Sequence, residues 1–324
     1  MKSKRWLGSA FLLLAAFLWG STFVAQSETG VGPFTYLAMR SLVAVVFLTP
    51  IVLLSDFREK RKNPRSNEKK TDKLLLLGGL ICGCALFFAS SLQQIGIDKG
   101  TTAGNAGFIT ALYILIVPIL GLFFRQKVRL LHWVCIFMAL VGLFLLCMTG
   151  DIEVFSMKEL FSANTFKDLS VKPSDIYVLA SAFVFSIHIL VVDKLSPKVD
   201  CLKLSLIQFA VVAVISSVVM FVAEAPKIVD ILDSWVSILY AGVLSSGVAY
   251  TLQIFGQRYT PPTIASILMS LESTFAVISA IVFSAVATGV PELPTGYEWI
   301  GCGLMFAAIM LSQLPQKNVS SESI

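Results

Sequence analysis

The hydrophobic residues of this chain fall into long blocks separated by short polar stretches. Each block is about 20 residues long, the length of α-helix that spans a hydrocarbon core of roughly 30 Å. The blocks cover residues 7–25, 34–55, 74–97, 103–123, 131–149, 175–192, 202–223, 235–257, 263–285 and 297–314. The pattern predicts an all-α integral membrane protein with ten transmembrane helices.

The composition agrees with a membrane protein. The chain is 56% hydrophobic and 14% charged, whereas soluble domains carry about 25% charged residues. The first apolar run follows a basic N-terminus, as in a signal peptide, but it continues to Ala25 and is longer than the usual hydrophobic region of such a peptide. We therefore expect it to be the first membrane span.

The basic residues predict the orientation of the helices. If the N-terminus is cytoplasmic, 19 of the 25 Lys and Arg residues lie on the cytoplasmic side and five on the outer side. Cytoplasmic loops carry such an excess, so both termini are expected in the cytoplasm and the chain in the cell inner (cytoplasmic) membrane. The net charge of +5 reflects this bias, and we expect no nucleic-acid partner. The basic run 56–73 either anchors the topology or binds anionic lipid.

The two halves of the chain resemble each other. Residues 80–113 align without gaps on residues 239–272. The identities include Gly83 with Gly242, Gln94 with Gln253, Ile95 with Ile254, Thr101 with Thr260 and Ala106 with Ala265. Near residue 20, AAFLWG matches SAFVFS and pairs Trp19 with Phe185.

This repeat predicts the domain organisation. Because each half holds five helices, the second copy enters the membrane from the opposite side, which gives two inverted five-helix repeats. The first repeat is expected over residues 1–149 and the second over residues 175–314. An extracytoplasmic loop of residues 150–174 joins them, and residues 315–324 form a cytoplasmic tail.

Several segments resemble the EamA-type branch of the drug/metabolite transporter superfamily. LLLAAFLWGSTFVA resembles its Trp-Gly-Ser/Asn-x-Phe opening, and PFTYLAMRSLVAVVFL its Arg-bearing second helix. TTAGNAGFITALYILIVPILGLFF with KVRLLHWVCIFMALVGLFLL resembles its fourth and fifth helices, and SLESTFAVISAIVF with YEWIGCGLMFAAIML repeats that pattern. The resemblance covers nearly the whole chain. It implies ten helices in two inverted repeats and transport of metabolites or drugs, often amino acids.

The chain departs from the family pattern at three places. The family's Leu-Glu-Pro is Leu271-Glu272-Ser273 here. Its Gly-Glu at the end of the fourth and ninth helices is replaced by residues 125–127 and 286–288. These departures leave the expected fold unchanged, but they weaken any inference to one substrate.

Three ionisable residues lie inside predicted spans: Arg40, His188 and Glu272. Such groups cost about 2.5–3.5 kcal/mol or more at the bilayer centre and usually face the bundle interior or a cavity. At 1.5 Å per residue, Glu272 is roughly 13 Å from the cytoplasmic end of its span. Counted from the outer end of their spans, His188 is roughly 20 Å deep and Arg40 roughly 9 Å deep. Glu272 binds a substrate ammonium group or a proton, or forms a structural hydrogen bond. His188 lines the cavity or bonds a backbone carbonyl, and Arg40 turns inward or extends to the interface.

Uncharged residues complete the predicted binding site. Glu272 matches Tyr113 in the repeat and Arg40 matches Gln208, so the scaffold is symmetric and its charges are not. Trp19, Tyr36, Tyr113 and Tyr250 are aromatic residues on spans that border the expected cavity, where packing and substrate stacking are both open roles for Trp19. Gln94 and Gln253, at matching positions, are candidates for cavity or gate groups.

The absence of motifs narrows the function. There is no nucleotide-binding G-x-x-x-x-G-K-[ST], no H-E-x-x-H and no G-x-S-x-G, so we expect neither an ATP-driven pump nor an enzyme. With two histidines, and cysteines that lie in or at the edge of apolar blocks, no metal site and no cofactor are expected.

The predicted function is a secondary transporter or facilitator that moves an amino acid or related polar organic, with export as the expected direction, by alternating access. A non-transporting scaffold or sensor is the alternative. The expected partners are a small metabolite, the lipid bilayer and a proton, and the sequence makes no prediction of oligomeric state.

Overall fold

A computed structural model gives the fold of the chain. It describes residues 2–27, 29–62, 69–101, 103–124, 128–148, 172–289, 293 and 295–314. The predicted loop 150–174 lies almost wholly outside the described residues, as do residues 63–68 of the basic run and the whole of tail 315–324. The features predicted for those segments stay predictions.

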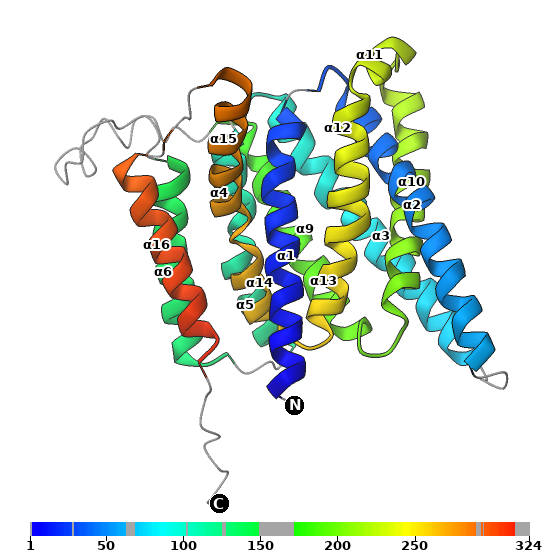
Figure 1. The fold of residues 1–324 in the computed structure, drawn as a ribbon, viewed down its shortest axis with the longest axis horizontal. Coiled ribbons are helices and arrows are strands. Elements are labelled where there is room, and N and C mark those ends of the chain that lie inside the picture. Colours follow the sequence, from blue (N-terminus) through cyan, green and yellow to red (C-terminus); the bar gives the residue numbers. More distant parts are fainter. Residues whose placement is uncertain are drawn as a thin grey trace, which may run out of the picture.

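The described chain is helical, and helix coincides with each of the ten apolar blocks. The helices are α1 (Lys2–Ser27), α2 (Pro33–Lys62), α3 (Lys69–Asp98), α4 (Ala103–Ala111), α5 (Tyr113–Phe123), α6 (Leu130–Met148), α9 (Asp175–Leu195), α10 (Cys201–Ala223), α11 (Ile228–Asp233), α12 (Trp235–Tyr240), the π-helix η1 (Ala241–Ala249), α13 (Tyr250–Gln257), α14 (Pro262–Met269), α15 (Glu272–Thr288) and α16 (Gly296–Ser312). Most run along one common direction, as expected of a bundle of membrane spans (Figure 1). Pro262 begins α14, because proline suits the first turn of a helix.

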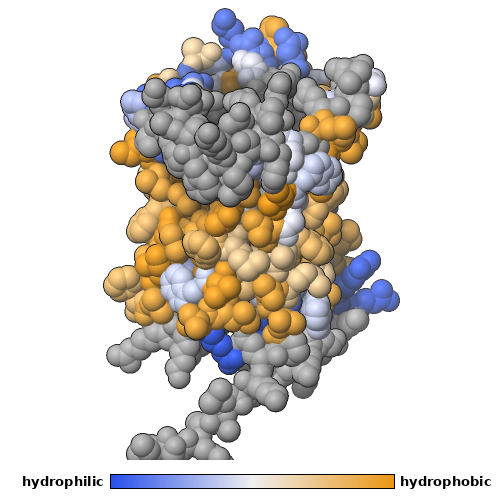
Figure 2. All heavy atoms as spheres, turned by 90° about the vertical axis from the view of Figure 1, so that its left-hand side faces the viewer, coloured by the Kyte–Doolittle hydropathy of each residue, from blue (hydrophilic) through white to orange (hydrophobic). Residues whose placement is uncertain are grey.

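An apolar belt surrounds the bundle. Seven helical segments of the described chain have the length and hydropathy to cross a membrane, and two shorter apolar helices accompany them. On the side formed by α6 and α16, hydrophobic residues cover the middle of the molecule (Figure 2). Phe137, Trp299 and Phe306 are each more than half exposed there. Exposed aromatic side chains in such number fit contact with lipid.

Two of the predicted spans are interrupted. The block 103–123 breaks at Leu112 between α4 and α5, and the block 263–285 breaks at Leu271 between α14 and α15. The two positions match in the predicted repeat and share their backbone conformation: φ −59° and ψ −11° at Leu112, φ −61° and ψ −10° at Leu271. Neither position is Gly or Pro, so the local sequence gave no sign of an interruption. Tyr113 and Glu272 each begin the second half of a broken helix.

A π-helix changes the register between the halves. Before η1, Gly83 and Gly242 differ by 159 positions and pack alike: a Cβ atom on Gly83 would lie 2.8 Å from the carbonyl of Gln208, and one on Gly242 would lie 2.9 Å from that of Arg40. After η1, Gly96 packs on α9 as Gly256 packs on α1, and these glycines differ by 160. The difference returns to 159 where α4 begins at Ala103 and α14 begins at Pro262. A π-helical turn accommodates an extra residue, which explains the shift.

The outer helices pair across the molecule. In Figure 1, α2 lies beside α10 at one edge of the bundle, and α6 lies beside α16 at the other. The second pair meets at Gly142 and Gly301, where a Cβ atom on either would lie less than 3 Å from the other's carbonyl oxygen. Ser9 donates a hydrogen bond to Gln313 Oε1 at 3.0 Å, so α1 begins at the same end of the bundle at which α16 ends. Between the two pairs lies the group of helices that encloses the site.

Candidate functional site

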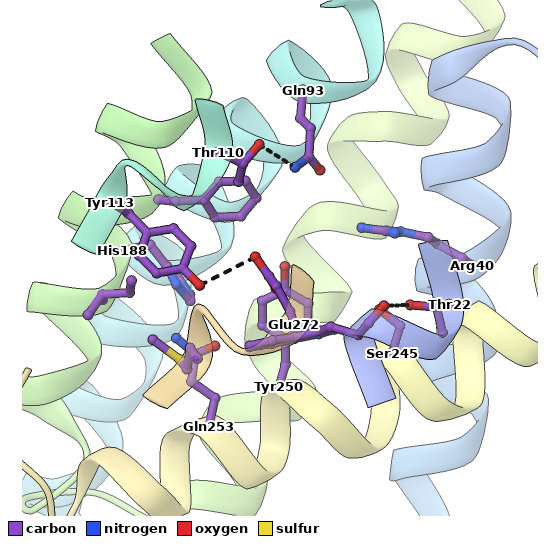
Figure 3. A pocket seen from close by; sticks show the side chains of 14 residues that line it. Thr22, Arg40, Gln93, Thr110, Tyr113, His188, Ser245, Tyr250, Gln253 and Glu272 are labelled. Atoms are coloured by element: carbon purple, nitrogen blue, oxygen red, sulfur yellow. Dashed lines mark hydrogen bonds between the residues drawn. The ribbon is translucent and has the colours of Figure 1, made fainter. Parts of the chain in front are cut away.

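A buried cavity lies in the middle of the bundle, between the two interrupted helices. Side chains from α1, α2, α3, α4, α5, α9, η1, α13, α14 and α15 line it (Figure 3). The lining residues are Trp19, Thr22, Arg40, Gln93, Thr110, Tyr113, Phe185, His188, Ile189, Ser245, Tyr250, Gln253, Met269 and Glu272. Seven of the nine candidate residues named from the sequence are in this set, and Tyr36 and Gln94 are not.

Glu272 and Tyr113 meet inside the cavity. The Tyr113 hydroxyl donates a hydrogen bond to Oε1 of Glu272 at 3.3 Å, and both side chains are buried. Each residue begins a half-helix, and the backbone at both interruptions stays bonded to the preceding turn: Leu112 N donates to the carbonyl of Ile109 at 3.2 Å, and Leu271 N donates to that of Leu268 at 3.4 Å. The partner of Glu272 is thus its own counterpart in the repeat, and not the Ser or Thr of the structural alternative.

Arg40 turns inward. Its side chain is 7% exposed and lines the cavity from α2, so the guanidinium does not extend to the interface. Its Cζ atom lies 5.8 Å from the centre of the Tyr36 ring, a favourable cation–π arrangement. Tyr36 packs in a separate apolar cluster with Ile238 and Ala241 and does not line the cavity. Within the described chain, neither Arg40 nor Glu272 is within ion-pair distance of an opposite charge.

An aromatic wall closes one side of the cavity. The ring of Tyr250 lies edge-on to Trp19, with centroids 4.9 Å apart, and to His188, with centroids 6.2 Å apart. His188 Nε2 lies 3.2 Å from the amide oxygen of Gln208, so a side-chain amide takes the place of the backbone carbonyl expected as the alternative. Edge-on ring pairs contribute about 0.5–1.5 kcal/mol beyond their buried area, so these contacts stabilise the wall.

The predicted pairing of Gln94 with Gln253 is off by one residue. Gln253 lines the cavity, but Gln94 lies outside its lining, and the neighbouring Gln93 takes that place. The reason is the extra residue in η1: under the shifted register, Gln93 is the counterpart of Gln253. Successive residues of a helix point about 100° apart, so the shift alone moves Gln94 off the cavity wall. Gln93 Nε2 donates to Thr110 Oγ1 at 2.9 Å.

The other residues missed by the sequence reasoning belong to two kinds. Thr22 and Phe185 follow from the predicted pairing, since Thr22 matches His188 and Phe185 matches Trp19 in the two halves. Thr110 and Met269 match each other and lie two residues before Leu112 and Leu271 respectively. The internal alignment could therefore have found both pairs, whereas no sequence signal indicates Ile189 or Ser245.

The cavity holds polar atoms without partners. Among the described residues, Trp19 Nε1, Arg40 Nε, His188 Nδ1 and Gln253 Oε1 are buried and make no hydrogen bond. Buried polar groups are normally paired, so these atoms are suited to a polar solute or to water. In the described part of the chain, no three His, Cys, Asp or Glu side chains come together as metal-ion ligands.

The free space in the cavity is small, about 70 Å³. Pockets that enclose organic ligands measure about 300–1,000 Å³. In this conformation the cavity has room for water or a small fragment.

Comparison with known proteins points to one family. The sequence model of the EamA-like transporter family matches residues 6–148 and again residues 172–314. An uncharacterized transporter of Archaeoglobus fulgidus is 24% identical over 321 residues, which cover 96% of this chain and 87% of that protein. A solved structure, described as the crystal structure of a protein, superimposes with a TM-score of 0.68 at 17% identity and covers 94% of this chain and 96% of its own. At that identity the likeness shows the fold alone.

Proposed function

Because the chain belongs to the EamA-like transporter family, we propose that it is a secondary transporter or facilitator of a small zwitterionic metabolite. The family and the archaeal relative establish a multi-pass membrane transporter and not an enzyme. The finer proposal is that an amino acid or related polar organic is carried across the cytoplasmic membrane, with export as the physiological direction.

The observation that carries the proposal is the arrangement of charge in the cavity. Arg40 and Glu272 both line one buried space, and among the described side chains neither has an oppositely charged partner. Isolated buried charges are costly, and inside membranes they mark substrate or ion pathways. A zwitterion supplies a carboxylate for Arg40 and an ammonium group for Glu272. A proton on Glu272 is the second way to relieve its charge, which gives a coupling role to the same residue.

The paired architecture supports alternating access. The matched interruptions at Leu112 and Leu271, and the matched contacts of Gly83 and Gly242, are what two inverted repeats would produce. Transporters of that design bind substrate at discontinuous helices between their halves and open to each side in turn. The small volume of the cavity fits a conformation closed around the site. This cavity beside Glu272 favours transport over a non-transporting scaffold, in which Glu272 would only join helices.

Transport in proteoliposomes tests the proposal. Labelled amino acids and related organics are measured for uptake, and for exchange from preloaded vesicles, with and without a pH gradient. We expect at least one zwitterion to be carried. Glu272→Gln and Arg40→Gln should each lower transport by about tenfold or more, as for loss of a charged hydrogen bond. Glu298→Gln and Arg58→Gln are matched controls, since neither residue lines the central cavity.

Three results would contradict parts of the proposal. If the folded protein carries none of the zwitterions but carries a solute of one charge, the substrate class is wrong. If Glu272→Gln leaves uptake, exchange and their pH dependence as in the parent protein, the central role of Glu272 is wrong. If preloaded vesicles keep the solute although its concentration is higher inside, and the same vesicles take it up from outside, the proposed direction of export is wrong.

A further inference from the structure

A second and larger chamber lies near the end of the bundle at which α1 begins. Its volume is about 590 Å³, and its wall includes Arg5 of α1, Arg258 after α13, and Arg129 just before α6. Asp193 of α9 is the acidic residue on this wall. The chamber is therefore predominantly basic, unlike the central cavity, where one Arg faces one Glu.

One turn of helix separates the chamber from the central cavity. On α13, Gln253 lines the cavity and Gln257, four residues later, lines the chamber. On α9, Ile189 lines the cavity and Asp193 lines the chamber. Four residues of α-helix rise about 6 Å, so the partition between the two spaces is about one side chain thick.

Two buried amides fill this partition. Gln253 Nε2 donates to Gln257 Oε1 at 3.1 Å, and Gln257 Nε2 donates to the carbonyl oxygen of Ile189 at 3.0 Å. Each Gln side chain is 2% exposed. The chain of bonds joins α13 to α9 across the space through which the cavity and the chamber would connect. Gln253 Oε1 has no partner among the described residues, so the arrangement leaves one acceptor free.

We propose that the Gln253–Gln257 pair is a gate between the central cavity and the basic chamber, through which the transported solute passes. The proposal rests on the proposed transport function. Neutral amide hydrogen bonds suit a gate, because each contributes modestly in net terms and both can be exchanged for bonds to water or to the solute as they break. An apolar plug in the same place would offer a polar solute no such exchange.

The other half of the molecule lacks this device. Gln93 is the counterpart of Gln253, but the position that corresponds to Gln257 is the apolar Ile97. Gln93 donates instead to Thr110 on α4, beside the cavity. The amide pair is thus specific to one end of the pathway, and we infer that the two ends open by different contacts.

Chemical labelling from each side of the membrane tests the gate. A reporter cysteine replaces Thr22, which lines the cavity, and a second reporter replaces Pro197, which is exposed on the chamber wall. Sealed vesicles of either orientation are treated with a membrane-impermeant methanethiosulfonate, and mass spectrometry gives the rate at each reporter. The side from which Pro197→Cys reacts identifies the chamber side. The native cysteines can stay, because each modified peptide is identified directly.

We expect Gln257→Ala to raise the rate at Thr22→Cys from the chamber side by about tenfold, since it removes both hydrogen bonds of the gate. Gln253→Leu removes one bond and should give a smaller increase. Gln313→Ala is the matched control: it removes the amide that accepts from Ser9 at the same end of the bundle, but it borders neither space. In each variant, an unchanged melting temperature in detergent shows that the fold is retained, and an unchanged rate at Pro197→Cys shows that access to the chamber is unaltered.

The proposal fails if Gln257→Ala labels Thr22→Cys no faster than the parent while Pro197→Cys still reacts. It also fails if Gln313→Ala gives the same increase, because the effect would then be general loosening of the bundle. Labelling needs no substrate. If Gln257→Ala speeds labelling but the protein carries no solute, the proposed function is wrong and the gate is supported. If the protein transports a solute but Gln257→Ala leaves labelling unaltered, the gate is wrong and the proposed function is supported.

Discussion

The hydroxyl group of Tyr113 donates a hydrogen bond to Glu272 at 3.3 Å, and the two residues occupy the same position in the two halves of the chain. Each is the first residue after the interruption of a helix. The two similar halves of the chain thus contact each other at their interrupted helices. The matched positions hold different side chains, so the two halves contribute the phenol of Tyr113 and the carboxylate of Glu272 at the same place in the cavity.

Replacing Tyr113 by Phe tests the importance of this contact. The change leaves the buried carboxyl group of Glu272 without its donor, at a cost of about 1–3 kcal/mol. We expect a lower melting temperature in detergent and weaker transport. Tyr240→Phe is the control, because it removes a hydroxyl that donates to Ser21 at 2.9 Å and that does not line the cavity. Equal effects of the two changes on transport would show that the Tyr113 hydroxyl has no special role.

Replacing Gly20 by Ala tests how α1 holds the second interruption. A Cβ atom at Gly20 would lie 2.5 Å from the carbonyl oxygen of Glu272 and 2.6 Å from Cβ of Phe275, so α1 and α15 must move apart. Overpacking of this kind costs about 1–3 kcal/mol. We expect a lower melting temperature and impaired transport together, because the displaced backbone carries Glu272.

The control for Gly20 is Gly303. This glycine lies within α16, and a Cβ atom there would meet nothing within 4 Å. Ala in a helix interior is favoured over Gly by about 0.5–1 kcal/mol, so Gly303→Ala should keep or raise the melting temperature. If Gly20→Ala behaves in the same way, the close approach of α1 to Glu272 is not as tight as the structure has it.

Two carboxylates at opposite ends of the α2–α10 pair should differ in their contribution to stability. Glu224 accepts bonds from the backbone N–H groups of Phe34 and Thr35, both at 2.9 Å, and from the Thr35 hydroxyl at 2.6 Å. It therefore caps the start of α2. Asp56, at the other end, pairs with Lys203 at 2.8 Å, with side chains 30% and 27% exposed respectively.

We expect Glu224→Ala to cost about 2 kcal/mol, because it leaves the first turn of α2 without acceptors and removes a charge that its dipole favours. Asp56→Ala should cost about 0–1 kcal/mol and less in high salt, as for exposed ion pairs. Unfolding in detergent mixtures at two salt concentrations measures both. A larger loss for Asp56→Ala would contradict the assignment of Glu224 as the helix cap.

Most of the helix positions, and the residues on which the function is proposed to depend, could be predicted from the sequence. Apolar blocks of fixed length define the helices because a bilayer demands internally bonded segments of that length. Arg40, His188 and Glu272 stood out because charge inside such blocks is costly. Their cavity could be predicted as well, since residues of this kind avoid lipid.

The tertiary structure decided the rest. The interruptions at Leu112 and Leu271 have no Gly or Pro, so they depend on packing between helices, such as that of Gly20 on Glu272. The extra residue in η1 replaces Gln94 by Gln93 at the cavity, and sequence alignment at a constant offset has no means of detecting it. The contact between Tyr113 and Glu272, and the amide partition beside the basic chamber, join segments far apart in the chain. Hydrophobicity determines which segments enter the membrane, but only close packing in three dimensions determines which side chains meet inside it.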